Sequence, residues 1–375
     1  MMGRHRIKDR ISYGFLISLV LFIWIVLTSS PASAAQPFEL HLLDVGQGLG
    51  VLIEADGHYM LIDGGGRKSS SFVVSYMKQQ EIDHFDIIAL SHYDEDHMSG
   101  EIGVLSVFPD ETLLLPSYEG EGDLYQSFCR AAITNGAEIL HPHAGEEYRL
   151  GNATVSMIGP ARTDYELVND RSLALRITYG DVSCIICGDA EQTAEMEMAS
   201  SGEDLSADVY VANHHGSRTS STDDFLDAVA PDYALISCGR DNSYGHPAEE
   251  ALQRLHERGI QIYRTDLQGT IILYSDGDTY WFNQDPCQDW TPGTYKAETR
   301  QLPANGDTET TGIRIDEGDT LSEKCQYICN TNTGKFHYPE CPSVEQMKEK
   351  NRLYSSLSRE ELIAQGYQPC GNCNP

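Results

Sequence analysis

The sequence predicts an α/β fold for its central part, followed by a linker and a small cysteine-rich domain. Residues 36–283 alternate short apolar runs, bounded by Gly, Asp and Asn, with stretches of helical period. Residues 284–323 are rich in Thr, Asp, Gly, Pro and Glu and have almost no apolar period, which is typical of a linker. Residues 324–375 hold five of the ten cysteines. A chain of 375 residues is long enough for about two domains.

The elements of the central part follow from these runs. Seven apolar segments are expected to form strands: FELHLLD, HYMLID, DIIALS, ALRITYG, DVYVAN, YALISCG and GTIILYS. Four stretches between them are expected to form helices: residues 69–80, 123–136, 223–229 and 247–259. In the last of these, Pro247 suits the first turn and Gly259 suits the end. Interleaved strands and helices predict one α/β domain.

The first residues have the order of a secretory signal. Four basic residues precede the apolar run 15–27, and the small residues 32–35 follow it. We therefore expect residues 1–34 to be a signal peptide and the protein to be secreted, with an uncleaved membrane anchor as the alternative. No later stretch is long and apolar enough to span a bilayer.

The charge balance limits how the protein can hold its partners. The chain has 26 Lys and Arg against 57 Asp and Glu, a formal net charge of -31. This acidity opposes a broad electrostatic hold on nucleic acid or on an anionic membrane, because such binding depends on basic residues. A phosphate-bearing substrate would need cations that are supplied locally.

The glycines near the start do not form a nucleotide-binding motif. Gly46, Gly48 and Gly50 follow a predicted strand, but Val51 stands where the dinucleotide fingerprint requires another glycine. We therefore expect no nucleotide cofactor.

One segment concentrates residues that bind metals. The predicted strand DIIALS is followed by His92, Asp94, Glu95, Asp96 and His97. Adjacent carboxylates repel one another unless a cation compensates them. Imidazole nitrogens and carboxylate oxygens suit zinc or manganese. The alternative is a solvated acidic loop.

Further predicted strands end in residues of the same kind. Asp189 follows VSCIICG, His214 and His215 follow DVYVAN, and His246 lies before a helix after YALISCG. Each of these alone is an ordinary turn, loop or helix-cap residue. Together, at successive strand ends, they predict one metal site, with Asp63 supporting the ligands from behind.

In chain order, seven segments resemble a known family: LDVGQG, LIDGG, SHYDEDHMSG, NDRSLALR, ICGDA, NHHGSRTSS, and SYGHP followed by YRTDLQGTI. They are similar to the metallo-β-lactamase-fold hydrolase domain of ComEC-type DNA-uptake proteins. The resemblance implies a four-layer αββα sandwich with a hydrolytic site for one or two metal ions at one edge of the paired sheets. This chain has no multi-span membrane channel, so we do not expect it to conduct DNA itself.

The resemblance also implies the site residues. The expected metal ligands are His92, Asp94, Asp96, His97, Asp189, His215 and His246, with His214 as an alternative to His215. Asp189 is expected to bridge two ions, and Asp96 to bind one ion and orient the attacking water. His246 is expected to contact the substrate or to protonate the leaving group.

Three further residues are expected to contact the substrate. Tyr244 is an alternative to His246 in the last role, and Ser217 and Arg218 are expected to hold a phosphate oxygen. Ser217 has an alternative interpretation as a turn residue.

The site departs from the superfamily pattern at two positions. Asp94 stands where most members have a second histidine, which moves the preference toward manganese or a mixed zinc site. The third histidine of the superfamily has no obvious counterpart, and Asn169 or Asp170 is the nearest candidate. One ion is therefore expected to bind weakly.

The tail predicts a second metal site. His337 with Cys341, and Cys370 with Cys373, form two close couples about thirty residues apart. This spacing predicts a structural zinc site, which would let a short segment fold. Disulfides are the alternative, and the state of Cys325 and Cys329 stays open. The segment resembles the Ada-type zinc-binding module.

The same resemblance limits what the tail does. A histidine, His337, replaces the cysteine that accepts an alkyl group in the Ada protein, so alkyl transfer is not expected. The function that remains possible for the tail is a zinc-stabilised contact with DNA or another polymer.

These observations lead to one main function and two alternatives. The main expectation is an exported metal-dependent phosphodiesterase or nuclease that cleaves extracellular nucleic acid with a metal-activated water. The first alternative is an ester, lactone or lactam hydrolase on the same fold. The second is a non-catalytic nucleic-acid-binding protein in which the tail binds.

Overall fold

The computed structural model divides the chain into two units, Met1–Thr299 and Arg300–Pro375. It describes residues 37–294 of the first, and of the second residues 327–330, 333, 335–338, 341–345, 347–348, 351–355, 359, 362, 367–370 and 373. The predicted signal peptide and Cys325 lie outside these residues. Within the described parts, no helix has the length and apolar character needed to cross a membrane.

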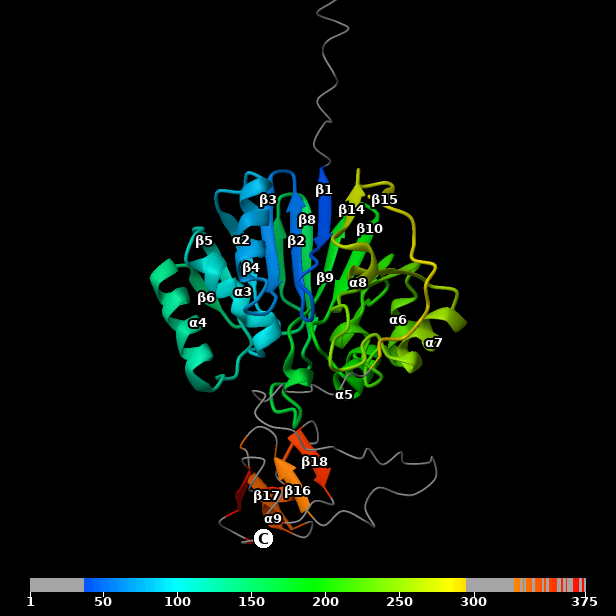
Figure 1. The fold of residues 1–375 in the computed structure, drawn as a ribbon. Coiled ribbons are helices and arrows are strands. Elements are labelled where there is room, and N and C mark those ends of the chain that lie inside the picture. Colours follow the sequence, from blue (N-terminus) through cyan, green and yellow to red (C-terminus); the bar gives the residue numbers. More distant parts are fainter. Residues whose placement is uncertain are drawn as a thin grey trace, which may run out of the picture. The chain divides into compact units, whose positions relative to one another are not determined.

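The first unit contains two mixed sheets that pack face to face (Figure 1). The eight-stranded sheet has the order β15-β14-β1-β2-β3-β4-β5-β6. Its strands are β1 (Phe38–Leu42), β2 (Gly50–Ala55), β3 (His58–Gly64), β4 (Phe85–Ala89), β5 (Asp110–Leu114), β6 (Glu138–Leu140), β14 (Ile271–Ser275) and β15 (Tyr280–Phe282). Strands β3 to β6 are parallel neighbours, so their carboxyl ends lie at one edge.

The seven-stranded sheet has the order β13-β12-β11-β10-β9-β8-β7. Its strands are β7 (Glu147–Leu150), β8 (Ala153–Gly159), β9 (Ala174–Tyr179), β10 (Val182–Ile186), β11 (Val209–Val211), β12 (Tyr233–Ile236) and β13 (Gln261–Arg264). Strands β10 to β13 are parallel, so the segments that follow β10, β11 and β12 also leave from one edge.

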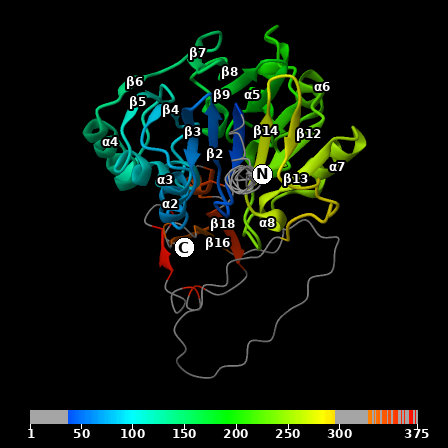
Figure 2. The same ribbon diagram turned by 90° about the horizontal axis from the view of Figure 1, so that it is seen from above.

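Helices cover the outer face of each sheet (Figures 1 and 2). The first sheet packs on α2 (Ser70–Gln79), α3 (Glu95–Leu105) and α4 (Gly122–Asn135). The second packs on α5 (Gln192–Ser200), α6 (Asp223–Val229) and α7 (Glu249–Glu257). Shorter helical turns are η1 (Asn169–Arg171), η2 (Asn213–Gly216) and α8 (Thr265–Gln268).

Three apolar layers explain this stacking. Ile62 of β3 packs between the two sheets, whereas its neighbour Leu61 packs under α2 and α3, because successive side chains of a strand face opposite ways. Strand β10 divides in the same way, with Ile186 facing the other sheet and Ile185 facing α5 and α6. Both faces of each sheet are therefore buried, and the predicted four-layer αββα sandwich is confirmed.

The first unit extends beyond the predicted boundary at residue 283. The Cys287 N–H donates to the Ile262 carbonyl at 2.7 Å, and the Gly293 N–H donates to the Pro247 carbonyl at 2.8 Å. The Trp290 ring packs edge-on against His256 of α7. Residues 284–294, the first part of the predicted linker, are thus held by these separate contacts. Such contacts do not require a periodic pattern of apolar residues in the sequence. The rest of that linker lies outside the described residues.

The second unit contains a four-stranded sheet with the order β18-β16-β17-β19. Its elements are β16 (Tyr327–Asn330), β17 (Lys335–His337), α9 (Pro342–Glu345), β18 (Arg352–Ser355) and β19 (Gln368–Pro369). Among its described residues, the buried apolar clusters contain Ile328, Val344, Met347 and Leu362 together with Cys341 and Cys370.

Candidate metal-dependent active site

The predicted ligands meet because four strands deliver them to one edge. His92 follows β4, Asp189 follows β10, His214 and His215 follow β11, and His246 lies beyond β12. The carboxyl ends of parallel strands gather such loops together. In this structure the loop after β4 of the first sheet meets the loops after β10, β11 and β12 of the second sheet.

The segment after β4 is partly helical. Asp94 precedes α3, and Glu95, Asp96 and His97 form its first turn. Negative charge is favourable at a helix N-terminus, so these carboxylates also stabilise α3. His97 is fully buried, whereas the Asp94 side chain is 41% exposed. A solvated acidic loop does not bury its histidine in this way.

Two close approaches of backbone shape the floor of the site. Gly48 has φ +132°, and a Cβ there would lie 2.2 Å from the Asp96 carbonyl oxygen. A Cβ on Gly100 would overlap the Gly64 carbonyl, so α3 lies directly on the end of β3. Gly48, near the start of the chain, therefore allows the backbone to pack closely against the ligand segment.

One group of ligand atoms surrounds Oδ1 of Asp189. His97 Nε2 lies 3.2 Å from this oxygen, and His215 Nε2 lies 3.4 Å from it. Asp96 Oδ2 is 3.7 Å from His215 Nε2. Asp96, His97 and His215 form a cluster in which all ligand atoms lie within 4.8 Å of one another.

A second group surrounds Oδ2 of the same carboxylate. His214 Nε2 lies 3.7 Å from this oxygen, and His92 Nε2 lies 3.9 Å from it. Asp94 Oδ2 is 4.0 Å from His92 Nε2. The two neighbouring histidines 214 and 215 thus face different oxygens of Asp189, so the sequence alternatives are both brought to the site.

The donor atoms fit a cation. The Nε2 atoms of His92, His97 and His215 and the Oδ1 atom of Asp189 are buried and make no hydrogen bond. Buried polar atoms are costly to leave without a partner. Histidine nitrogens and a carboxylate oxygen that are buried without a partner suit one or two ions that take nitrogen and oxygen ligands.

The opposite ring nitrogens are held by fixed partners. His97 Nδ1 lies 2.7 Å from Asp63 Oδ2, and His215 Nδ1 lies 3.0 Å from the Ser237 carbonyl oxygen. His92 Nδ1 lies 3.0 Å from the Ser91 hydroxyl, which itself donates to Asp63. A partner at Nδ1 directs Nε2 into the site, which is how buried carboxylates and carbonyls orient metal-binding histidines.

The charges of the cluster are strongly coupled. Burial opposes protonation of His97, yet Asp189 and Asp63 raise its pKa well above the usual value. Burial would raise the pKa of Asp189, but His215 and His97 lower it well below its usual value. A cation bound at this point would also be attracted by the Asp189 carboxylate.

His246 and Tyr244 lie beside the ligand groups. The His246 ring is 5.4 Å from that of His214, and Tyr244 stacks on His246 with ring centroids 5.6 Å apart. Burial and the neighbouring His215 and His214 rings lower the pKa of His246 to about 3, so the ring is neutral. Tyr244 is 53% exposed and presents an aromatic face.

Two residues that the sequence did not single out hold this loop. Gln47 Nε2 lies 3.4 Å from His246 Nδ1, and Asn242 bonds both the N–H and the carbonyl of His246. The motif LDVGQG contains Gln47, but only the fold shows that it reaches across to β12.

The predicted phosphate-binding residues differ in their surroundings. Ser217 is buried, and its hydroxyl lies 3.0 Å from that of Thr219, so it closes the turn as in the alternative interpretation. Arg218 is exposed. Its carbonyl oxygen accepts a hydrogen bond from Arg254.

Neither candidate for the missing third histidine reaches the ligand groups. Asp170 Oδ1 accepts the N–H groups of Glu191 and Ala194 and so caps α5. Asn169 donates to the Glu191 carboxylate. In the structure, His214 is the additional histidine beside His92.

A separate cluster lies in the second unit. His337, Cys341, Cys370 and Cys373 have ligand atoms that all lie within 4.8 Å of one another. His337 Nδ1 is buried and makes no hydrogen bond. The described cysteines, Cys329 among them, form no disulfide, and burial raises the pKa of the Cys329 thiol to about 11. The cluster can hold a zinc ion.

The layered fold and the shared ligand carboxylate define a metal-dependent enzyme of the hydrolase type. The chain belongs to the metallo-β-lactamase superfamily, which its residues 43–240 match. Members typically bind one or two metal ions, commonly zinc, and are metal-dependent hydrolases.

Curated relatives confirm the resemblance to ComEC-type proteins. The chain is 28% identical over 273 residues to ComE operon protein 3 of Bacillus subtilis, covering 68% of this chain and 34% of that protein. It is 30% identical over 231 residues to competence protein ComA of Neisseria gonorrhoeae, covering 61% and 31%. The chain thus spans about a third of the length of these relatives.

Solved structures include a similar fold. The metallo-β-lactamase fold protein YhfI from Bacillus subtilis aligns with a TM-score of 0.41 and 14% identity, over 60% of this chain and 95% of that one.

Proposed function

We propose that this protein is an exported metal-dependent phosphodiesterase that cleaves nucleic acid. The observation that carries the proposal is a pair of adjacent ligand clusters that share His97, one with His92 and Asp189 and the other with Asp96 and His215. Two adjacent cations suit the attacking and leaving oxygens of a phosphodiester. The name of one relative, competence protein ComA, favours nucleic acid as the substrate.

The roles of the protein's own residues follow from their positions. When bound, the ions would polarise a phosphoryl oxygen and lower the pKa of a water. Asp96, whose side chain is 27% exposed, faces both the ligand group and the solvent and would orient that water. Neutral His246 would donate a hydrogen bond to the leaving oxygen.

The rim would hold the substrate by local contacts. Tyr244 offers a stacking face for a base, and exposed Arg218 offers a charge for a phosphate. The net charge of -31 is the reason why these few groups matter. The C-terminal zinc module would add a further contact with the polymer.

Export is supported by the sequence of residues 1–34, with retention as a membrane anchor as the alternative. Zinc and manganese both suit the nitrogen and oxygen ligands, and the carboxylate Asp94 favours the harder ion.

The test uses the protein without residues 1–34, loaded with zinc or with manganese. Single-stranded DNA, double-stranded DNA, RNA, bis-p-nitrophenyl phosphate and an acyl ester are offered in parallel. We expect cleavage of phosphodiesters by the native protein and loss of at least a hundredfold in Asp189→Asn. Asp278→Asn, in the exposed turn after β14 at the opposite edge of the sheet, is the matched control and should cleave normally.

Two outcomes would contradict the proposal. Turnover of the ester alone would favour an acyl hydrolase. Metal-loaded protein that binds DNA but cleaves none of the substrates would favour a binding protein.

A further inference from the structure

The loop that carries His214 and His215 has an unusual backbone. Both histidines have positive φ, +50° and +59°, and Gly216 continues the left-handed turn at +74°. Left-handed backbone is unfavourable for a residue other than glycine. Such conformations persist only where the surrounding structure enforces them. Something must therefore hold residues 213–222 in place.

Glu195 joins the two ends of this loop. It lies in α5 and is fully buried. Its Oε1 accepts the Asn213 side-chain amide at 2.7 Å and the Ser221 N–H at 2.6 Å. Its Oε2 accepts the Thr222 N–H at 2.7 Å. All three partners donate, so an ionised carboxylate satisfies them and a protonated one would not.

The position of α5 makes this contact relevant to the ligands. The helix begins at Gln192, three residues after Asp189, and its first turn is fixed by the Asp170 cap. Glu195 is one turn further along. The short helix α5 therefore follows the shared carboxylate of Asp189 at its N-terminus. Through Glu195 it also forms hydrogen bonds with the loop that carries the two histidines.

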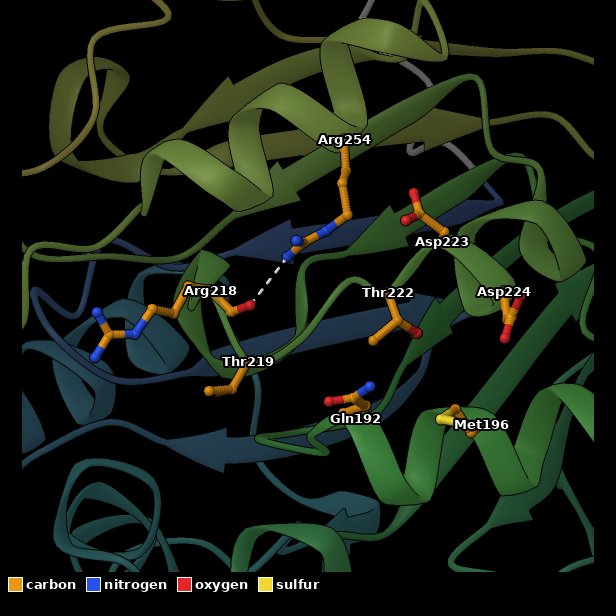
Figure 3. Close-up of a pocket in the computed structure, with 8 residues that line it drawn as sticks. All are labelled: Gln192, Met196, Arg218, Thr219, Thr222, Asp223, Asp224 and Arg254. Carbon is orange, nitrogen blue, oxygen red and sulfur yellow. Dashed lines mark hydrogen bonds between the residues drawn. The ribbon is translucent and has the colours of Figure 1, made fainter. Parts of the chain in front are cut away.

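Arg254 of α7 holds the same loop from the other side. Its guanidinium donates to the carbonyl oxygens of Ser220 and Ser221, each at 2.7 Å. A further bond reaches the Arg218 carbonyl at 3.1 Å, which Figure 3 shows as a dashed line. The peptide groups on either side of Ser221, itself at φ +55°, are thus bound by opposite charges, Glu195 at the N–H and Arg254 at the carbonyl.

Open space lies beside the part of the loop that Glu195 and Arg254 contact, whereas hydrogen bonds to Gly188 and Ala248 hold the loop at His214 and Gly216. A pocket of about 320 Å³ lies next to it, lined by Gln192 and Met196 of α5 together with Thr219, Thr222 and Arg254. Apolar packing does not fill this side. Near Ser221, the loop therefore depends mainly on polar contacts for its position.

We propose that Glu195, with Arg254 opposite, is a positioning residue that sets the left-handed turn and thereby directs His214 and His215 to the two oxygens of Asp189. The inference rests on the metal site of the proposed function but not on its substrate. It predicts a loss of metal affinity with the fold retained.

The test measures metal binding by competition with a chromophoric chelator and the absorption spectrum of the cobalt-loaded protein. Glu195→Gln places an amide N–H against a donor while keeping the side chain's shape. We expect metal affinity to fall about 10–100-fold, as for other residues that orient ligands, and the cobalt spectrum to change. Glu197→Gln is the matched control, because Glu197 lies in the same helix but binds Tyr165 and Arg162. It should bind metal as the native protein does.

Arg254→Lys is an independent variant that keeps the charge but loses the forked contact. Arg254→Lys should also lower metal affinity. If Glu195→Gln does not fold, Arg254→Lys alone tests whether these contacts position the histidine loop. Native affinity and an unchanged cobalt spectrum in a folded variant would overturn the proposal. A native protein that binds no metal would overturn the metal site itself, whereas metal binding without phosphodiester cleavage would affect only the proposed function.

Discussion

Asp63 and His97 form a fully buried carboxylate and imidazole pair, with Oδ2 and Nδ1 2.7 Å apart. The Oδ1 atom of Asp63 also accepts the Ser91 N–H at 2.7 Å, so one carboxylate connects the end of β3 with the end of β4 and with α3. Asp63 itself has φ +58°, which turns the chain toward α3. The pair fixes which nitrogen of His97 faces the ligand group.

Asp63→Asn should therefore weaken metal binding. One amide orientation places an N–H against the proton on His97 Nδ1, and the other places it against the Ser91 N–H. We expect metal affinity to fall about 10–100-fold, measured by chelator competition. Asp86→Asn is the control, because Asp86 pairs with half-exposed His58 at the other end of β4. Equal affinity in Asp63→Asn and the native protein would show that the pair does not orient His97.

Gly48→Ala should destabilise the protein more than an ordinary glycine substitution. Gly48 has positive φ, and the new Cβ would lie 2.2 Å from the Asp96 carbonyl, so both strain and overlap arise. Gly202→Ala separates these effects, since Gly202 has φ +86° and open space around it. We expect Gly202→Ala to cost about 1 kcal/mol and Gly48→Ala at least about twice that, measured by urea unfolding. Similar costs at the two positions would contradict the close approach.

Asp110 predicts a pH dependence of stability. Burial at the start of β5 raises its pKa to about 8, above the value of 3.8 that holds in the unfolded chain. The folded state then binds the extra proton, so the contribution of Asp110 becomes less favourable as pH rises from about 4 to 8 and is constant above. Asp110→Asn should raise stability by about 1–3 kcal/mol at pH 8.5 and change it little at pH 4. An equal gain in stability for Asp110→Asn at both pH values would disprove the raised pKa of Asp110.

Tyr244 predicts a difference between polymeric and small substrates. If its exposed ring stacks on a base, Tyr244→Ala should remove about 1–3 kcal/mol of binding free energy. The KM for single-stranded DNA should then rise roughly 5–150-fold. The turnover of bis-p-nitrophenyl phosphate, which has no base, should change little. Tyr244→Phe keeps the ring and should retain the KM of the native protein. A fall in kcat on both substrates would instead place Tyr244 in proton transfer.

The cysteine cluster predicts one additional zinc. Cys341→Ser should lower the zinc content by one ion per chain, measured by elemental analysis, and should expose the second unit to proteolysis. A chain ending near Glu323 should lose the same single ion and keep the phosphodiesterase activity proposed above. An unchanged zinc content in Cys341→Ser would exclude the site.

The parallel strands and their ligands could be predicted from sequence, because a run of buried residues that ends in Asp or His is a local pattern. Two helices at the site could not. The helix α3 contains Gly100 and Gly103 and lacks a clear apolar stripe, since it packs by backbone approach to Gly64. In α5 a buried position is occupied by Glu195, which periodicity assigns to solvent.

The roles of neighbouring histidines also lay beyond the sequence. In an extended strand, residues 214 and 215 would point to opposite faces and only one of them would reach the site, whereas the left-handed turn brings both to Asp189. Asp170, which was expected near the metal, caps α5 instead. This role could not be predicted, because its partners at Glu191 and Ala194 are distant in sequence.

The segment 284–294 determines where this enzyme can be shortened. A chain that stops at Phe282 keeps every strand of both sheets, yet it leaves the carbonyls of Ile262 and Pro247 without their donors and removes the two carbonyls that bind buried Arg264. Gly293 lies against the His246 carbonyl, where a Cβ would come within 2.2 Å. The smallest fragment suited to kinetic study therefore ends after Gly293, and a shorter one would report the damage to the His246 loop rather than the chemistry of the site.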